Sequence, residues 1–191
     1  MSDAFEVIPP AIKTGRLNMR RLTVEDTPAI YAYASDAEVA RFTLWPPHKS
    51  EEFTKRFLGF FTQPIFLSWA ITLPESVEAI GMVFLHSLSK QHKKAEIAFN
   101  LARAYWKKGL TTEATGSALD FAFQQLCLNR VEATCMPANL GARRVLERAG
   151  MSHEGTMRRS HVRYDGAHDM DLFAMLRDDK RTGDAVGAGS T

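Results

Sequence analysis

The 191-residue sequence is poor in cysteine, with only Cys127 and Cys135. Two thiols are too few for a disulfide framework, and their spacing matches no zinc-binding motif. His153, His161 and His168 lie near one another in the sequence, but their wide spacing favours positions on the surface or in a substrate groove over a metal site. We therefore expect reduced thiols and no bound metal.

The chain also lacks long apolar runs and an excess of charge of one sign. Its most apolar stretch, Ile65–Leu73, covers about nine residues, whereas a membrane span needs roughly 20. Residues 1–6 contain neither the basic nor the apolar segment of a signal peptide. A net charge of +2 is too small to indicate binding to nucleic acid or to an anionic membrane. These absences favour a cytoplasmic protein with no membrane or nucleic-acid partner.

Two nucleotide-binding signatures are missing as well. Neither the G-x-x-x-x-G-K-[ST] phosphate loop nor the G-x-G-x-x-G dinucleotide fingerprint occurs in the chain. The composition is that of an ordinary globular protein, with 45% apolar and 24% charged residues, and there are no internal repeats. We expect a single domain over residues 13–176, after an N-terminal extension over 1–12 and before a disordered Gly- and Ser-rich tail over 177–191.

Hydrophobic periodicity predicts a mixed α+β domain. Apolar and polar residues alternate over 16–22, which is typical of a half-buried strand, and Asp26 and Pro28 then mark a helix start. Ser50 begins a second helix that ends before Pro64. The other expected elements are strands at 66–73, 79–85, 95–101 and 130–136, helices at 111–126 and 138–149, and a last pair of strands at 153–162 and 169–176.

The segment 99–114 joins a strand directly to a helix and is the clearest candidate for a ligand site. The first-turn amides of a helix are unpaired and attract anions. Gly109 allows the backbone to approach a ligand closely or to take a positive φ. Lys107 and Lys108 add positive charge, and the threonines at 111–112 add hydroxyl donors. Taken alone, the segment fits a solvated loop with a glycine hinge equally well.

Four dispersed motifs give this segment a context. They are Thr14–Leu22 with Glu25–Asp26, Ser35–Val39 with Trp45–His48, Tyr105–Ala114, and Asn139–Met151 with Glu154–Gly155. Together and in this order they resemble the GNAT superfamily of N-acetyltransferases, specifically the group that acetylates the N-termini of ribosomal proteins (the Rim group). The resemblance covers about residues 13–176. Each motif is weak alone, but four in the right order exclude a chance match.

The resemblance implies a central twisted, mostly antiparallel sheet of about seven strands flanked by about four helices, with the parallel fourth and fifth strands splayed apart. It implies that acetyl-CoA lies in this gap, with its pantetheine arm paired to the backbone of Phe99, Asn100 and Leu101. Asn139 would hydrogen-bond the pantetheine as well as cap a helix, and Arg144 would meet the adenosine phosphates. The pyrophosphate would be held by Trp106, Lys107, Lys108, Gly109, Leu110, Thr111 and Thr112.

Three positions depart from the family pattern. The family usually has Gly where Lys107 stands, and Gly or Ala where Thr111 stands. Ala142 replaces a serine that, in the Rim group, is a candidate acid for the leaving thiol. A thiol with a pKa near 8.5 can leave as a thiolate at pH 7 at a cost of roughly 2 kcal/mol, so the loss of this acid is tolerable.

Glu96 is the candidate general base, acting directly or through a water molecule, although a solvated carboxylate at a strand end fits as well. An N-terminal α-amine needs about 1 kcal/mol to lose its proton at pH 7, whereas a lysine needs about 5 kcal/mol. Because the chain offers no obvious strong base, an easily deprotonated amine is the favoured acceptor.

The leading hypothesis is therefore transfer of an acetyl group from acetyl-CoA to a protein or peptide N-terminal amine. Acetylation of a small amine, such as a polyamine, an amino acid or an antibiotic, fits the same scaffold. A non-catalytic acyl-CoA-binding module with a regulatory role is the third alternative. The family resemblance also suggests a homodimer.

Overall fold

A computed structural model describes residues 7–179. The elements are, in chain order, β1 (Ile12–Lys13), β2 (Asn18–Arg21), a 3-10 turn (Val24–Asp26), α1 (Thr27–Ala34), α2 (Ala37–Ala40), α3 (Glu51–Phe61), β3 (Leu67–Thr72), β4 (Gly81–Ser89), β5 (Lys94–Leu101), a second 3-10 turn (Arg103–Tyr105), α4 (Leu110–Gln124), β6 (Arg130–Cys135), α5 (Leu140–Arg148), β7 (Ser152–Arg163) and β8 (Gly166–Leu176). The expected α+β class is confirmed. Two short elements were not expected, namely β1 with 2 residues and α2 with 4 residues.

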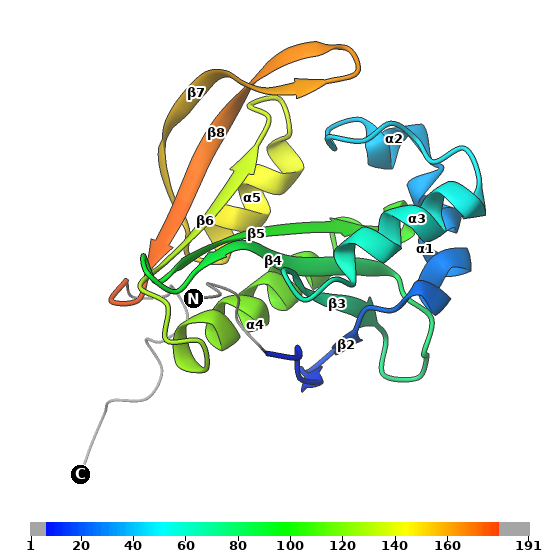
Figure 1. Ribbon diagram of the computed structural model, residues 1–191, viewed down its shortest axis with the longest axis horizontal. Coiled ribbons are helices and arrows are strands. Elements are labelled where there is room, and N and C mark those ends of the chain that lie inside the picture. Colours follow the sequence, from blue (N-terminus) through cyan, green and yellow to red (C-terminus); the bar gives the residue numbers. More distant parts are fainter. Residues whose placement is uncertain (1–6, 180–191) are drawn as a thin grey trace.

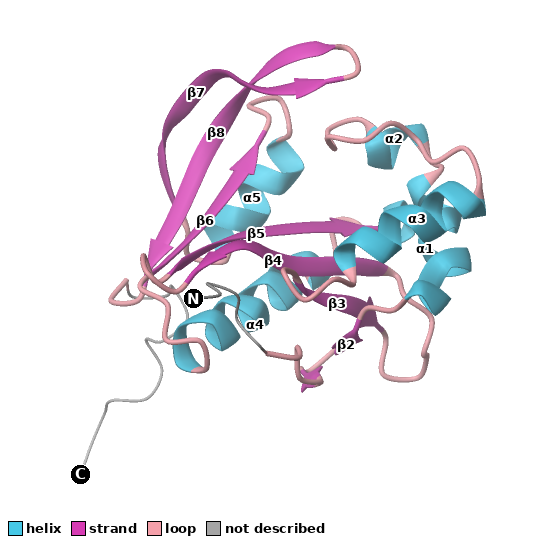
Figure 2. Ribbon diagram, viewed as in Figure 1, coloured by secondary structure: helices cyan, strands magenta, loops and turns pink. Residues whose placement is uncertain are grey.

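The strands form one 8-stranded sheet in the order β1-β2-β3-β4-β5-β6-β8-β7. All neighbours are antiparallel except β5 and β6, which are parallel. The helices cover the sheet on both faces (Figure 2).

Helix starts follow the capping signals of the sequence. The Ser50 hydroxyl accepts a hydrogen bond from the Phe53 amide at 3.2 Å, and Pro28 lies in the first turn of α1. The Asn139 side chain caps α5 by accepting from the Ala142 amide at 3.1 Å. The Ser50 and Asn139 side chains satisfy amides that have no partner inside the helix, so α3 and α5 begin where their caps stand.

Alternation along the strands divides the core into two clusters on opposite faces of the sheet. Trp69 and Val83 belong to the cluster that includes α4, while Ala70 and Met82 belong to the cluster that includes α1 and α3. Successive side chains of a strand point to opposite faces, so this division follows from the sequence pattern. The Trp69 indole also donates to the Pro10 carbonyl at 2.8 Å, which ties the segment before β1 to the sheet.

The parallel pair separates soon after it begins. β5 pairs with β6 only over Lys94–Glu96, opposite Arg130–Glu132, although β5 continues to Leu101 and β6 to Cys135. Figure 1 shows the two strands side by side at their starts and diverging towards their ends. The expected splay is confirmed, and its strands are numbered β5 and β6 because β1 precedes the others.

The β7–β8 hairpin reaches back to the loop that follows α2 (Figure 1). At its tip, the guanidinium of the buried Arg163 donates to the carbonyls of Arg41 and Thr43 at 2.7 and 3.0 Å. Asp165 accepts a further hydrogen bond from the same guanidinium at 2.9 Å. The hairpin and the α1–α3 segment are therefore linked directly beyond the splayed ends of β5 and β6.

The C-terminal boundary lies slightly later than the sequence suggests. Arg177 falls in the expected tail, yet its backbone amide donates to the Asn129 carbonyl at 3.0 Å and its side chain to the Leu128 carbonyl at 3.0 Å. Residues 180–191 of the expected tail lie outside the described residues, as do residues 1–6 of the expected N-terminal extension.

Candidate active site

One edge of β5 is open beyond the point of divergence. From Ile97 to Leu101 the strand pairs with β4 on one side, and within residues 7–179 no strand pairs with the other side. Phe99 and Asn100 lie in this stretch, where unpaired backbone groups can bind an extended ligand. The Leu101 carbonyl is already engaged, because the Trp106 indole donates to it at 2.7 Å. The Asn100 side chain accepts a hydrogen bond from the Tyr33 hydroxyl at 2.7 Å.

The loop before α4 contains two residues with left-handed backbone. Gly109, at the N-cap of α4, has φ 76°, and Lys107 has φ 61°. Glycine adopts this region freely, whereas a residue with a side chain pays roughly 1 kcal/mol. Lys107 therefore takes, at some conformational cost, a backbone conformation that glycine would adopt freely.

The first turn of α4 presents free amide donors. The amides of Leu110, Thr111 and Thr112 make no hydrogen bond within the described part of the chain, and the Glu113 amide is the first to bond back, to the Gly109 carbonyl at 3.1 Å. The Leu110 side chain is buried in the core, so only its backbone is available to a ligand. Amides at a helix N-terminus bind anions, as the sequence predicts for this loop.

The same loop is braced from the β1–β2 turn. The Glu113 carboxylate accepts hydrogen bonds from the Arg16 side chain at 2.7 Å and from the Arg16 amide at 3.0 Å, and Arg16 also donates to the Lys108 carbonyl at 2.8 Å. Burial raises the pKa of Glu113, but hydrogen bonds from Thr14 and Arg16 outweigh it and lower the pKa below its usual value. Sequence reasoning missed this contact between distant segments, because no local signal marks Glu113 as a partner of Arg16.

The two predicted residues of α5 occupy different environments. The Asn139 carbonyl oxygen is used in the cap, while its amide nitrogen has no partner in residues 7–179 and is free to donate to a ligand. Arg144 is exposed, and no ion pair to it exists among the described residues. Ala142 packs against the core and brings no hydroxyl to this place.

Glu96 lies at the last paired position before β5 and β6 diverge, opposite Glu132. Its neighbours Ala95 and Ile97 face the α4 side, so Glu96 points to the face covered by α1 and α3. Across the antiparallel β4–β5 pair it meets His86, whose Nε2 lies 3.9 Å from Glu96 Oε2. Sequence reasoning missed His86, because no motif marks it and only the strand register brings it to Glu96.

Aromatic rings extend from His86 along the same face. Phe84 lies with its ring centroid 5.6 Å from that of His86, and Phe61 lies 4.6 Å from Phe84. Phe66 completes the group, 5.0 Å from Phe61 and 6.4 Å from His86. All three phenylalanines are partly exposed, so Glu96 and His86 have an apolar wall beside them.

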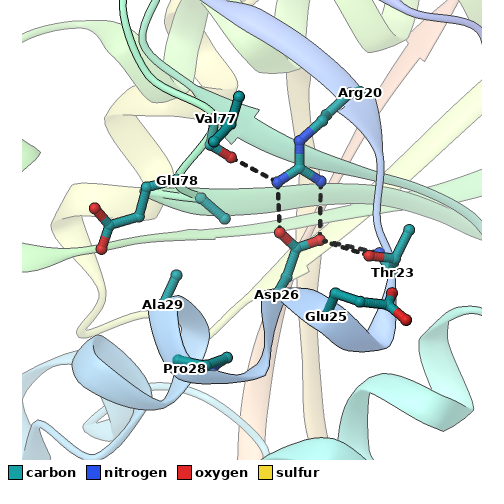
Figure 3. A pocket seen from close by; sticks show the side chains of 9 residues that line it. Arg20, Thr23, Glu25, Asp26, Pro28, Ala29, Val77 and Glu78 are labelled. Carbon is teal, nitrogen blue, oxygen red and sulfur yellow. Dashed lines mark hydrogen bonds and ion pairs between the residues drawn. The ribbon is translucent and has the colours of Figure 1, made fainter.

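A pocket of 480 Å³ lies elsewhere, between β2, the start of α1 and the loop before β4 (Figure 3). Its centre is a two-pronged contact of Arg20 with the buried Asp26, and Arg20 also donates to the Val77 carbonyl at 2.7 Å. Asp26 accepts in addition from the Thr23 amide at 3.0 Å. The hydrogen bonds of Arg20 and Asp26 join β2, the start of α1 and the β3–β4 loop, and no predicted site residue lines the pocket.

Two other kinds of site are absent from the described part of the chain. No cluster of three or more His, Cys, Asp or Glu side chains is arranged to hold a metal ion in residues 7–179. Over the same range, no helix combines the length and the apolar character needed to cross a membrane.

The geometry suits coenzyme A as the resemblance implies. An open strand edge offers backbone partners to the amide groups of a pantetheine arm, and the helix start with its left-handed residues offers donors to a pyrophosphate. The Lys107 and Lys108 side chains flank that helix start, both exposed. Lys108 also lies over the Tyr105 ring, with its Nζ 5.3 Å from the ring centroid.

Comparison with known proteins agrees with this geometry. The Acetyltransferase (GNAT) domain family matches residues 16–152. YoaA of Bacillus subtilis, an uncharacterized N-acetyltransferase, is 26% identical over 172 residues, which cover 88% of this chain and 97% of YoaA. The crystal structure of a GNAT-family acetyltransferase from Bacillus anthracis matches with a TM-score of 0.80 and 27% identity, over 88% of this chain and 99% of that one.

A third similar structure is RimL, a ribosomal L7/L12 alpha-N-protein acetyltransferase solved in complex with coenzyme A. It has a TM-score of 0.79 and 17% identity, over 90% of this chain and 100% of RimL, and it shows likeness of fold. The family match covers most of the chain, and the fold is like that of the solved GNAT-family acetyltransferase. The chain belongs to the GNAT acetyltransferase family and is an N-acetyltransferase.

Proposed function

We propose that the protein transfers the acetyl group of acetyl-CoA to an N-terminal α-amine of a protein or peptide, and that Glu96 removes the proton of this amine. The observation that carries the proposal is the position of Glu96, at the last paired residue before β5 and β6 part. A carboxylate there stands beside the open strand edge and faces the side of the sheet that carries α1 and α3. The GNAT fold implies acetyl-CoA as the acetyl donor.

In this proposal the cofactor residues divide into three groups. The backbone of Phe99 and Asn100, and less so of the partly engaged Leu101, pairs with the pantetheine arm. Asn139 donates to the same arm through its free amide nitrogen, and Arg144 meets the adenosine phosphates. The pyrophosphate is held by the loop and first turn of α4, through Trp106, Lys107, Lys108, Gly109, Leu110, Thr111 and Thr112.

The reaction is a direct attack of the neutral amine on the thioester carbonyl. Backbone amides of β5 stabilise the negative charge that develops on the carbonyl oxygen. The amine loses a proton to Glu96, acting directly or through a water molecule. Because Ala142 offers no hydroxyl, the thiol leaves without an acid from this position.

The surroundings of Glu96 favour a peptide over a small polycation. Its neighbour Glu132 is held by Arg130 Nε at 2.7 Å and by Lys94 Nζ at 3.4 Å, so its charge is not available to attract a cation. The wall formed by Phe61, Phe66 and Phe84 is apolar and suits a side chain of a peptide better than a polyamine. The named activity of RimL, α-N-protein acetylation, agrees with this choice.

The proposal is tested by measuring thiol release from acetyl-CoA with a panel of acceptors. The panel contains peptides with free N-termini, the same peptides with blocked N-termini, a polyamine, free amino acids and an aminoglycoside. We expect release to depend on the free N-terminus. Release with a small amine alone would contradict the proposed acceptor, and coenzyme A binding without release for any acceptor would contradict catalysis as a whole.

A further inference from the structure

Glu96 and His86 form an isolated pair in the middle of the sheet. They are direct cross-strand neighbours, with Nε2 of His86 3.9 Å from Oε2 of Glu96. Both side chains remain accessible, with 26% of His86 and 33% of Glu96 exposed to solvent, so a substrate can reach them.

The charged groups on the neighbouring strands are engaged elsewhere. From β6, Arg130 binds Glu132 at 2.7 Å and Glu154 of β7 at 2.9 Å, and Lys94 of β5 also binds Glu132 at 3.4 Å. In residues 7–179, no cationic side chain other than His86 pairs with Glu96. A purely structural carboxylate would be expected to share the lysine or the arginine, as Glu132 does.

The backbone of β4 directs the His86 ring. Immediately after His86 the register with β5 shifts, and Ser87 has a left-handed φ of 50°. Irregularities of this kind re-aim side chains next to active sites, and a left-handed residue that is not glycine indicates a conformation held at a cost. Ser87 Oγ lies 3.1 Å from Nδ1 of His86, which leaves Nε2 on the side of Glu96.

We propose that His86 is the final acceptor of the proton that Glu96 takes from the amine substrate. In the first step, an N–H bond of the substrate ammonium breaks, its electron pair stays on nitrogen, and the proton bonds to a Glu96 carboxylate oxygen. In the second step, that O–H bond breaks and an N–H bond forms at Nε2 of His86, which leaves an imidazolium beside a carboxylate. The inference rests on the proposed function, because it needs an amine substrate at Glu96.

The ordinary pKa values of a carboxylate and an imidazole explain why His86 is useful as a second proton acceptor beside Glu96. In water an imidazole is a stronger base than a carboxylate by about 2 pKa units, so it is the better resting place for a proton. Burial lowers the pKa of His86, and the charge of Glu96 acts in the opposite direction to a smaller extent. His86 is therefore neutral and ready to accept at neutral pH, and the imidazolium forms next to a charge that stabilises it.

The test compares His86→Gln with His92→Gln in the full chain. His92 is an exposed histidine of the turn between β4 and β5 and serves as the matched control. For His86→Gln we expect kcat to fall by about 100-fold, with an unchanged KM for acetyl-CoA and without the histidine inflection in the pH profile of kcat. His92→Gln should match the wild type. An unchanged kcat and pH profile in His86→Gln would overturn the inference.

A second variant separates proton transfer from a structural role. In His86→Ala, added imidazole should restore a large part of kcat, whereas it should not restore Glu96→Gln. Coenzyme A titration checks that both variants still bind the cofactor. Loss of activity in His86→Ala without rescue, despite normal coenzyme A binding, would assign His86 a structural role and overturn the inference. A wild type that is inactive with every amine would instead overturn the proposed function itself.

Discussion

At the scale of single residues, the loop before α4 holds a lysine in a backbone conformation that favours glycine. Lys107 takes a left-handed φ of 61° and Gly109 takes 76°, two residues apart. The lysine bears a modest conformational cost and adds a positive charge where the pyrophosphate is proposed to lie. Thr111 lies in the first turn of α4. The backbone amide that it is proposed to offer to the pyrophosphate does not depend on its side chain.

These backbone conformations predict different effects on coenzyme A affinity when Gly109, Thr111 or Lys107 is changed. Gly109→Trp places a bulky side chain at a left-handed residue in the proposed pyrophosphate loop, so we expect coenzyme A affinity to fall by at least ~100-fold, about 2.7 kcal/mol. Thr111→Ala should bind coenzyme A with the affinity of the wild type. Lys107→Gly should relieve the strain of the left-handed backbone and remove one positive charge from the loop. Calorimetric titration of coenzyme A measures all three, and equal affinity of Gly109→Trp and the wild type would remove this loop from the cofactor site.

At the scale of elements, the start of α3 is anchored by a buried histidine in an aromatic setting. The His48 ring lies 4.7–4.9 Å from the rings of Trp45, Phe53 and Phe57, and its Nδ1 is 2.8 Å from Thr54 Oγ1. Its Nε2 is buried without a partner in the described residues. Burial lowers the pKa of His48 to about 4, because the charged ring would be poorly solvated there.

This pKa predicts a loss of stability in mild acid. The unfolded chain binds a proton at His48 near pH 6.5 and the folded chain only near pH 4, so the unfolded state gains protons between these values. The contribution to the free energy of unfolding is complete above pH 6.5 and decreases by about 3 kcal/mol as the pH falls to 4. Urea unfolding of the wild type and of His48→Phe over this range isolates the effect, since the variant retains the ring packing. Parallel pH curves for the two proteins would contradict it.

Some features of the helices and strands are predictable from local sequence, and others are not. Ser50 and Asn139 cap helices through contacts within a few residues, and the alternation of apolar and polar residues over 16–22 marks the strand β2, so these features were predictable. The strand β1 and the helix α2 are too short to produce a periodic signal. The position of His86 opposite Glu96 depends on the register of β4, which no local pattern specifies.

At the scale of the whole molecule, contacts between distant segments complete the site. Arg163 joins the tip of the β7–β8 hairpin to the loop after α2, and Arg16 joins the β1–β2 turn to the start of α4. No local pattern in the sequence predicts either contact, because the partners lie roughly a hundred residues away or more. The cofactor residues stay a prediction from the family resemblance, whereas the pairing of Glu96 with His86 is seen only in the folded chain.

The central claim is that the site acetylates an α-amine because its base is weak. The most direct measurement offers a single peptide that carries a free N-terminus and one lysine, together with acetyl-CoA at pH 7, and maps the product by tandem mass spectrometry. The two amines differ by about 2.6 pKa units, so the neutral form is roughly 400 times more abundant at the N-terminus. We expect the acetyl group on the α-amine with the lysine unmodified. Acetylation of the lysine in preference to the N-terminus would contradict the account.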